Sequence, residues 1–194
     1  MKKCLQFFRK NVATRLEWNS FVQKGYEGDE IIGMLVRTFP TNVPVIIVGN
    51  DGDLFQLLSV DRPSVSYYSI KMGTLITAED VRNKIGYSTK KVIAAKCIWG
   101  CTSDEIKGVK GIGEKRVLSF LTDPYSEYTE TILKRMDDTV LPNKELVSLP
   151  LEGTKVPKLK PFSMNMRGFV SVCKELGFIG LLNDKRKYEK MFCS

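Results

Sequence analysis

One apolar segment in the first quarter of the chain constrains the fold more than any other feature. Residues 43–49 read Val-Pro-Val-Ile-Ile-Val-Gly, a β-branched run in which apolar and polar residues do not alternate. Such a run is typical of a strand that is buried on both faces of a parallel sheet. A strand of this kind needs hydrogen-bonded neighbours and crossover helices on each face. The sequence therefore predicts an α/β fold built on a parallel sheet.

The segments around this strand predict helices and weaker strands. Apolar residues recur at helical spacing within 3–24, and an acidic cluster opens a second helix within 25–39. Residues 64–70 alternate and predict another strand, and 72–76 predict a short one. This count gives fewer strands than a parallel sheet of this kind needs. Either another polypeptide completes it, or the chain has lost its beginning, or this count of strands is too low.

From Thr77 onward the pattern becomes helical. Thr77 and Asp80 have the spacing of a capping box, with Asp in place of the usual Glu. Further helices are predicted at 89–99, 114–121, 126–136, 143–149 and 164–177, with a loop rich in Lys and Pro at 153–161. We therefore expect a partial α/β core at residues 1–70 and a mostly helical region at residues 71–194.

Charge is spread unevenly along the 194 residues. Residues 1–70 carry 8 basic and 7 acidic side chains, whereas residues 71–194 carry 22 and 15. A basic second half indicates a polyanionic partner, and solubility alone is the alternative explanation. The chain has no His, which excludes Ser-His-Asp, Cys-His and His-ligated zinc mechanisms. Acid–base chemistry must come from carboxylates, Lys, Tyr or metal-bound water.

The cysteines and the apolar runs indicate a reduced compartment and no membrane. Cysteines stand at positions 4, 97, 101, 173 and 193, an odd number without a Cys-x-x-Cys pair. This usage favours free thiols over a disulfide framework, and without His it does not predict a zinc site. No apolar run approaches the ~18–20 residues of a membrane helix, and no signal peptide is recognisable. We therefore expect a cytoplasmic protein.

Three acidic clusters stand where a site could form. The first opens the predicted helix, the second directly follows the core strand, and the third precedes a glycine-rich turn. Ligands of open α/β sheets bind outside the carboxyl ends of strands, where the second cluster lies. Converging carboxylates need a cation, and oxygen-only ligands favour Mg²⁺ or a pair of such ions. Taken singly, each cluster is better explained as an ordinary turn or a charged helix start. The candidate residues are Glu27, Asp29, Glu30, Asp51, Asp53 and Asp104.

The glycine-rich turn at 108–113 reads Gly-Val-Lys-Gly-Ile-Gly and precedes a predicted helix. Small residues allow close backbone approach, and the start of the helix offers free N–H groups to a phosphate. Such a turn suits a nucleic-acid backbone that is gripped without base reading. The alternative is a helix–helix turn with solvated lysines. The candidate DNA-binding residues are Lys107, Gly108, Lys110, Gly111, Gly113, Lys115 and Arg116.

Taken in order, these motifs resemble the structure-specific 5′ nucleases. Residue 26 begins Tyr-Glu-x-Asp-acid-Ile-Ile, and residue 47 begins Ile-Val-x-x-Asp-x-Asp-Leu-x-Gln-Leu-Leu. Residue 98 begins Ile-Trp-Gly-x-x-Ser-Asp-x-Ile-x-Gly-Val-x-Gly-Ile-Gly-x-Lys. The family includes flap endonucleases, phage 5′→3′ exonucleases and the 5′-nuclease domain of bacterial DNA polymerase I. The resemblance runs from about residue 25 to residue 182, and a bacterial or phage-infected cell would suit it.

The resemblance implies a PIN-like (Rossmann-like) sheet beside a helical DNA-binding region. It implies that the candidate acids hold Mg²⁺ or Mn²⁺, with two ions, for the hydrolysis of phosphodiester bonds. It further implies that 108–113 form a helix–hairpin–helix element that holds DNA, often through K⁺. Duplex, flap or nicked DNA and RNA–DNA hybrids are the expected substrates.

Two departures from the family leave the function open. Cys101 stands where the family has the first Asp of a Gly-Asp-x-Ser-Asp motif, and a neutral thiol is a poor Mg²⁺ ligand. The family's opening strands, further Asp ligands and basic arch have no counterpart here. The chain is therefore a nuclease completed by a second polypeptide, a catalytically inactive DNA-binding or assembly subunit, or a decayed gene product. The retained acids favour the first hypothesis, and the two departures favour the second.

Overall fold

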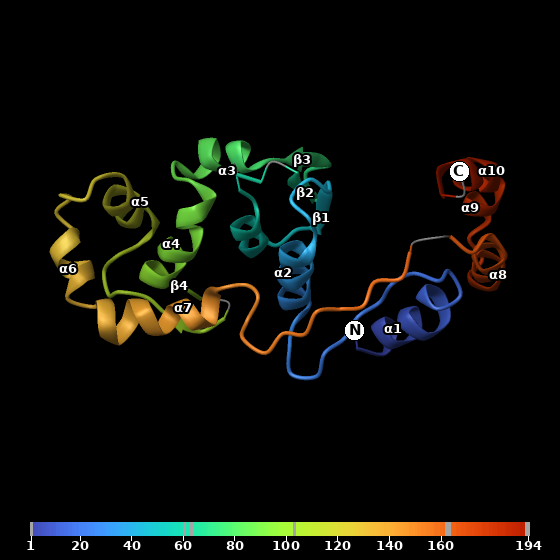
Figure 1. Ribbon diagram of the computed structural model, residues 1–194, viewed down its shortest axis with the longest axis horizontal. Coiled ribbons are helices and arrows are strands. Elements are labelled where there is room, and N and C mark those ends of the chain that lie inside the picture. Colours follow the sequence, from blue (N-terminus) through green and yellow to red (C-terminus); the bar gives the residue numbers. More distant parts are fainter. Residues whose placement is uncertain (1, 60, 63, 103, 162–163, 193–194) are drawn as a thin grey trace. The chain divides into compact units, whose positions relative to one another are not determined.

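The computed structural model describes residues 2–59, 61–62, 64–102, 104–161 and 164–192, so Cys193 and the Ser of the Ser-Asp motif lie outside the described residues. The chain forms two compact units (Figure 1). One unit joins Met1–Val22 to Pro157–Ser194, and the other is the continuous segment Gln23–Val156. None of the described helices is long and apolar enough to cross a membrane.

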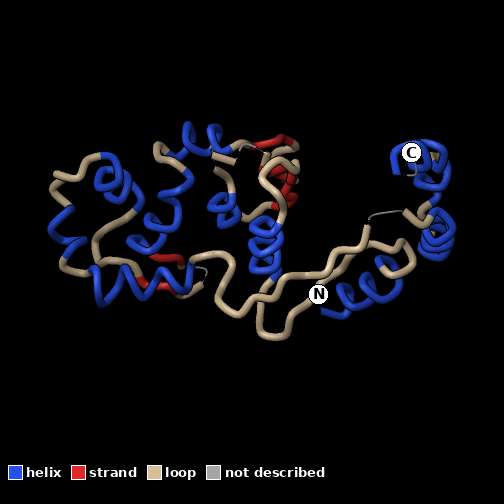
Figure 2. Tube along the Cα trace, in the orientation of Figure 1, coloured by secondary structure: helices blue, strands red, loops and turns tan. Residues whose placement is uncertain are grey.

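The larger unit contains a small mixed sheet, whose strands are drawn in red in Figure 2. Its strands β1 (Val45–Gly49), β2 (Val65–Ser69) and β3 (Thr74–Ile76) lie in the order β1-β2-β3. The pair β1–β2 is parallel, as predicted, whereas β3 runs antiparallel to β2. Helix α2 (Gly28–Thr38) precedes β1, and a 3₁₀-helix (Gly52–Leu57) follows it. The α/β class is confirmed, and the all-parallel sheet is corrected to a mixed one.

The expectation that β1 is buried on both faces is wrong. Ile47 is 4% exposed and packs with Val36 of α2, but Ile46 and Val48 are 59% and 57% exposed. The register places Val48 beside Tyr68 of β2, which in turn faces Leu75 of β3, and both of these side chains are exposed. One face of the sheet therefore forms a core, and the other presents apolar side chains to solvent.

Helices fill the rest of the larger unit. Helix α3 (Ala78–Ile85) starts with the predicted capping box, because the Thr77 hydroxyl accepts from the Asp80 N–H and the Asp80 carboxylate accepts from the Thr77 N–H. A short 3₁₀-helix (Thr89–Lys91) leads into α4 (Val92–Trp99). The following elements are α5 (Glu114–Thr122), α6 (Thr129–Leu133), a π-helix (Met136–Val140) and α7 (Leu141–Val147).

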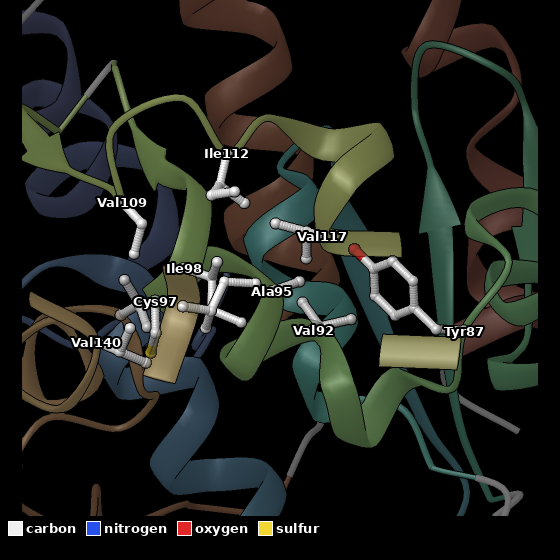
Figure 3. Packing of buried hydrophobic residues seen from close by; sticks show 11 residues of the cluster. Tyr87, Val92, Ala95, Cys97, Ile98, Val109, Ile112, Val117 and Val140 are labelled. Atoms are coloured by element: carbon white, nitrogen blue, oxygen red, sulfur yellow. The ribbon is translucent and has the colours of Figure 1, made fainter. Parts of the chain in front are cut away.

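Helix α4 lies at the centre of the second core. Ala95 and Ile98 are 1% exposed, and they pack with Val117 of α5 (Figure 3). Ile132 of α6 belongs to the same core. The hairpin of β4 (Gly100–Cys101) and β5 (Ile106–Lys107) directly follows α4. Such a buried helix fixes the hairpin, because few side chains in a close-packed core can shift.

The smaller unit brings the two ends of the chain together. It contains α1 (Lys2–Phe7), a π-helix (Phe8–Ala13), α8 (Met166–Leu176), α9 (Ile179–Asn183) and α10 (Lys185–Phe192). Val12 and Leu16 pack with Phe169 and Cys173 of α8. The helical pattern predicted over 3–24 ends near residue 13, where the chain turns to join this core. The division at residue 70 stays a prediction.

Two glycines of the turn after β5 allow a matched test of packing. A Cβ at Gly108 would overlap the carbonyl group of Trp99 and lie 2.6 Å from the Gly100 nitrogen, whereas a Cβ at Gly113 meets no atom within 4 Å. Because backbone atoms cannot move aside, we expect Gly108→Ala to lower the free energy of unfolding by about 2–3 kcal/mol. Gly113→Ala should cost less than about 1 kcal/mol. Urea unfolding followed by circular dichroism measures both, and equal losses would contradict the geometry.

Candidate active site

The structure brings all six candidate carboxylates into the lining of one pocket of about 380 Å³. They come from three separate places in the sequence, which are the start of α2, the end of β1 and the β4–β5 hairpin. All of them lie within the larger unit. The pocket residues are Glu27, Asp29, Glu30, Asp51, Asp53 and Asp104.

The start of α2 provides the first group of acids. Glu27 occupies the N-cap position in an extended conformation, and Asp29 and Glu30 lie in the first turn. The positive end of the helix dipole stabilises negative charge there. The Glu30 carboxylate accepts a hydrogen bond from the Leu151 N–H. Burial raises the pKa of Glu30, that hydrogen bond lowers it, and the charges of Asp29 and Glu27 raise it further. The pKa of Glu30 is raised overall, chiefly because burial disfavours its charged form.

The end of β1 provides the second group, as its position after the core strand predicts. Asp51 caps the 3₁₀-helix, and its Oδ1 accepts from the Asp53 N–H at 2.9 Å. The Asp53 carboxylate also forms an ion pair with Lys96 of α4, whose side chain is 13% exposed. A largely shielded lysine thus already neutralises part of the charge of the pocket.

The β4–β5 hairpin provides Asp104. The Cys101 thiol donates a hydrogen bond to Asp104 Oδ2 at 2.8 Å. Asp53, Cys101 and Asp104 each offer a possible ligand atom, and these three atoms lie within 4.8 Å of one another. In the described part of the chain, this is the one group of three or more Cys, Asp and Glu side chains that meets so closely.

Two amide side chains, the partly buried Gln56 and the buried Asn143, hold the walls of the pocket. Gln56 Nε2 donates to the carbonyls of Asp53 and Val147, and Gln56 Oε1 accepts from the Leu149 N–H. Asn143 Nδ2 donates to the carbonyls of Cys97 and Lys107, both at 2.9 Å. These contacts join the 3₁₀-helix, α4 and the hairpin to α7. The motif that begins at residue 47 contains Gln56, but nothing in the local pattern of Gln56 or Asn143 reveals this positioning role.

The predicted DNA-binding residues lie on one continuous segment. Val109 and Ile112 are buried in the core of α4 and α5, whereas Lys107, Lys110 and Lys115 are exposed. The other members of this segment shape the turn. Gly111 has φ +81°, Arg116 Nη1 donates to the Gly111 carbonyl at 2.6 Å, and Gly113 is the N-cap of α5. The Arg116 guanidinium also lies 5.3 Å from the centre of the Tyr128 ring. Arg116 therefore helps to form the turn, while the three lysines face solvent.

Comparison with known proteins relates this geometry to a family. A family model of the 5′–3′ exonuclease N-terminal resolvase-like domain matches residues 5–86. The 5′–3′ exonuclease of Bacillus subtilis is 33% identical over 145 residues, which are 74% of this chain and 45% of that protein. The thermostable DNA polymerase I of Thermus filiformis is 38% identical over 114 residues, which are 58% of this chain and 13% of the polymerase.

The chain is related to the 5′ nuclease family. The solved structure of the phage T5 5′-exonuclease with bound zinc has a similar fold, with a TM-score of 0.64 at 20% identity over 77% of this chain and 60% of that one. The T5 flap endonuclease in a complex with DNA and metal ions gives a TM-score of 0.62 at 21% identity, over 77% and 57% of the two chains. This chain spans less than half the length of the curated relatives named above.

The ion pair between Lys96 and Asp53 generates a prediction about the charge of the pocket. Lys96→Met keeps the buried stem of the side chain but leaves Asp53 without its cation. We expect the free energy of unfolding in EDTA to fall by about 1–2 kcal/mol, because a partly buried carboxylate loses its partner. Mn²⁺ should restore most of the loss, since it supplies positive charge to the same pocket.

The control is Lys90→Met, which breaks an ion pair with Asp61 whose side chains are more than 60% exposed. That change should cost less than about 1 kcal/mol and should show no response to Mn²⁺. Thermal unfolding with and without Mn²⁺ measures both variants. The same response from both would mean that Lys96 does not neutralise the pocket.

Proposed function

We propose that the chain is a metal-dependent 5′ nuclease that hydrolyses phosphodiester bonds in DNA, as a 5′→3′ exonuclease or a flap endonuclease. The convergence of six carboxylates in one pocket carries this proposal. Carboxylates from three distant segments are costly to gather unless a cation is bound there. The matches to 5′–3′ exonucleases support the same chemistry.

The donor set of the pocket suits divalent cations. Glu27, Asp29, Glu30 and Asp51 offer only oxygen, which Mg²⁺ and Mn²⁺ prefer. When bound, such ions activate water and stabilise the charge of the reacting phosphate. The chain's own residues place those ions: α2 and the end of β1 fix the carboxylates, and Lys96 orients Asp53. Two of the similar T5 nuclease structures contain bound metal ions, which supports the same donor role here.

The turn after β5 is proposed as the DNA-binding element, in the manner of a helix–hairpin–helix motif. Two helices, α4 and α5, flank it, and buried Val109 and Ile112 leave the lysines at 107, 110 and 115 exposed. Their positive charge suits phosphate groups of duplex, flap or nicked DNA or of an RNA–DNA hybrid. K⁺ bound by carbonyl groups of the turn is part of the same proposal.

A second polypeptide that completes the sheet also remains part of the proposal. Its support is that β1 lies at one edge of the described sheet, where it pairs with β2 alone, and that the apolar face containing Ile46, Val48, Tyr68 and Leu75 is exposed. The alternative function is a DNA-binding or assembly subunit without catalysis. Cys101 favours that alternative, because a thiol stands where the related nucleases have a carboxylate.

The activity is tested with 5′-flap and duplex DNA in Mg²⁺ or Mn²⁺, with the chain alone and together with the products of neighbouring genes. We expect cleavage, and we expect Asp51→Asn to slow it by about 10²-fold or more, because one oxygen ligand loses its charge. Asp61→Asn makes the same change at an exposed position outside the pocket and should leave the rate unaltered. DNA binding without cleavage in every mixture would select the non-catalytic subunit.

The DNA-binding turn is tested by reversing two exposed charges. Lys110→Glu together with Lys115→Glu should weaken binding to duplex DNA and reduce the slope of log K against log salt by about 2. Lys71→Glu with Lys84→Glu changes the net charge equally, away from the turn, and serves as the control. Fluorescence anisotropy at several salt concentrations measures the slopes. An unchanged slope in the first double variant would reject this interface.

A further inference from the structure

The group formed by Asp53, Cys101 and Asp104 differs chemically from the rest of the pocket. Its three possible ligand atoms comprise one sulfur and two carboxylate oxygens, all within 4.8 Å of one another. The other four pocket acids offer oxygen alone. The pocket therefore contains two kinds of donor set, and they do not suit the same ion.

The group that contains sulfur is a poor binding site for Mg²⁺. Mg²⁺ requires hard oxygen donors in near-ideal octahedral geometry and keeps several waters. Thiolate is a soft donor, and it selects Zn²⁺, Co²⁺ or Cd²⁺ over Mg²⁺. Three protein ligands with an open fourth position are also the usual arrangement of a catalytic zinc site.

We propose that Asp53, Cys101 and Asp104 form a mixed sulfur–oxygen site that takes a thiophilic divalent ion of the Zn²⁺, Co²⁺ and Cd²⁺ class in preference to Mg²⁺. This inference rests on the proposed function, because it assigns the ion of one part of the same metal centre. Binding forms a bond between Sγ and the metal and releases the thiol proton to solvent. No redox change is involved.

The β4–β5 hairpin fixes the positions of two of the three proposed ligands, Cys101 and Asp104. Cys101 pairs with Ile106 in the last register position of β4–β5, and Asp104 lies in the connection between these strands. Asn143 anchors both ends of this region through the carbonyls of Cys97 and Lys107. The hydrogen bond of 2.8 Å between Cys101 Sγ and Asp104 Oδ2 shows that the side chains already point toward one another. Little rearrangement is needed before an ion can replace the thiol proton.

Asp53 can coordinate the ion while its carboxylate remains paired with Lys96. Lys96 Nζ contacts Asp53 Oδ1, and an ionised carboxylate has a second oxygen with further lone pairs. Asp104 is exposed, and Cys101 and Asp53 are partly exposed, so the group is open to an ion from solvent. Lys96 also offsets the negative charge that a thiolate adds.

Cobalt spectroscopy provides the direct test. The full-length chain, stripped of metal and kept reduced, is titrated with Co²⁺, and we expect a near-ultraviolet charge-transfer band from sulfur to cobalt. Cys101→Ser should abolish the band and weaken Co²⁺ binding by about tenfold or more, with little effect on Mg²⁺ binding. Cys101→Asp should reverse the preference and strengthen Mg²⁺ binding by about tenfold. Cys4→Ser is the matched control, because Cys4 is an exposed thiol in the smaller unit, and it should retain the band.

A second measurement needs no variant. Cd²⁺ or Zn²⁺ should protect Cys101 of the natural chain from alkylation, whereas Mg²⁺ should not. Mass spectrometry of the labelled peptide measures the extent of alkylation. Calorimetry with Mn²⁺ distinguishes a failure of the mixed site from a failure of the proposed nuclease centre. Mn²⁺ binding without a sulfur band or protection overturns the mixed site but leaves the proposed nuclease centre intact. Failure of every divalent ion to bind overturns both.

Discussion

Repulsion among carboxylates is the constraint on which the candidate site depends. Like charges that share a small volume raise one another's pKa and oppose folding unless something neutralises them. The structure meets this cost in three ways. The α2 N-terminus faces one group of acids, Lys96 pairs with Asp53, and the Cys101 and Leu151 groups donate hydrogen bonds to Asp104 and Glu30. Each of these devices reduces the repulsion only in part, and the divalent ions that we propose would supply the remaining positive charge.

The rigid parts of the larger unit explain why these acids stay together. The acids occupy element ends, where the chain changes direction, but each element is fixed elsewhere. Buried Val36 and Ile47 join α2 to β1, and buried Ala95 and Ile98 fix α4 in the second core. Gln56 and Asn143 then link the two regions through backbone carbonyls. A site built at element ends on such a frame keeps its geometry, although its own residues are partly exposed.

Local patterns in the sequence predicted much of this arrangement. The β-branched run predicted β1 and placed Asp51 and Asp53 after its carboxyl end, and the spacing of Thr77 and Asp80 predicted the cap of α3. The same run failed to predict burial, because apolar character does not show whether a helix covers each face, and Ile46 and Val48 are exposed. Lys96, Gln56 and Asn143 escaped prediction for a related reason: the long-range partners that give them their roles are 36 to 93 residues away. Contacts at that separation leave no periodic signal.

Cys101 links the electrostatics of the pocket to the ion that we propose for it. A carboxylate at this position would add a further negative charge beside Asp53 and Asp104 in the absence of an ion. The neutral thiol instead donates to Asp104 and lowers that repulsion. A thiolate forms there when an ion strong enough to displace the proton binds, and Mg²⁺ is a weak competitor for sulfur. In the proposed site, the same side chain therefore lowers the repulsion among the carboxylates and narrows the choice of ion.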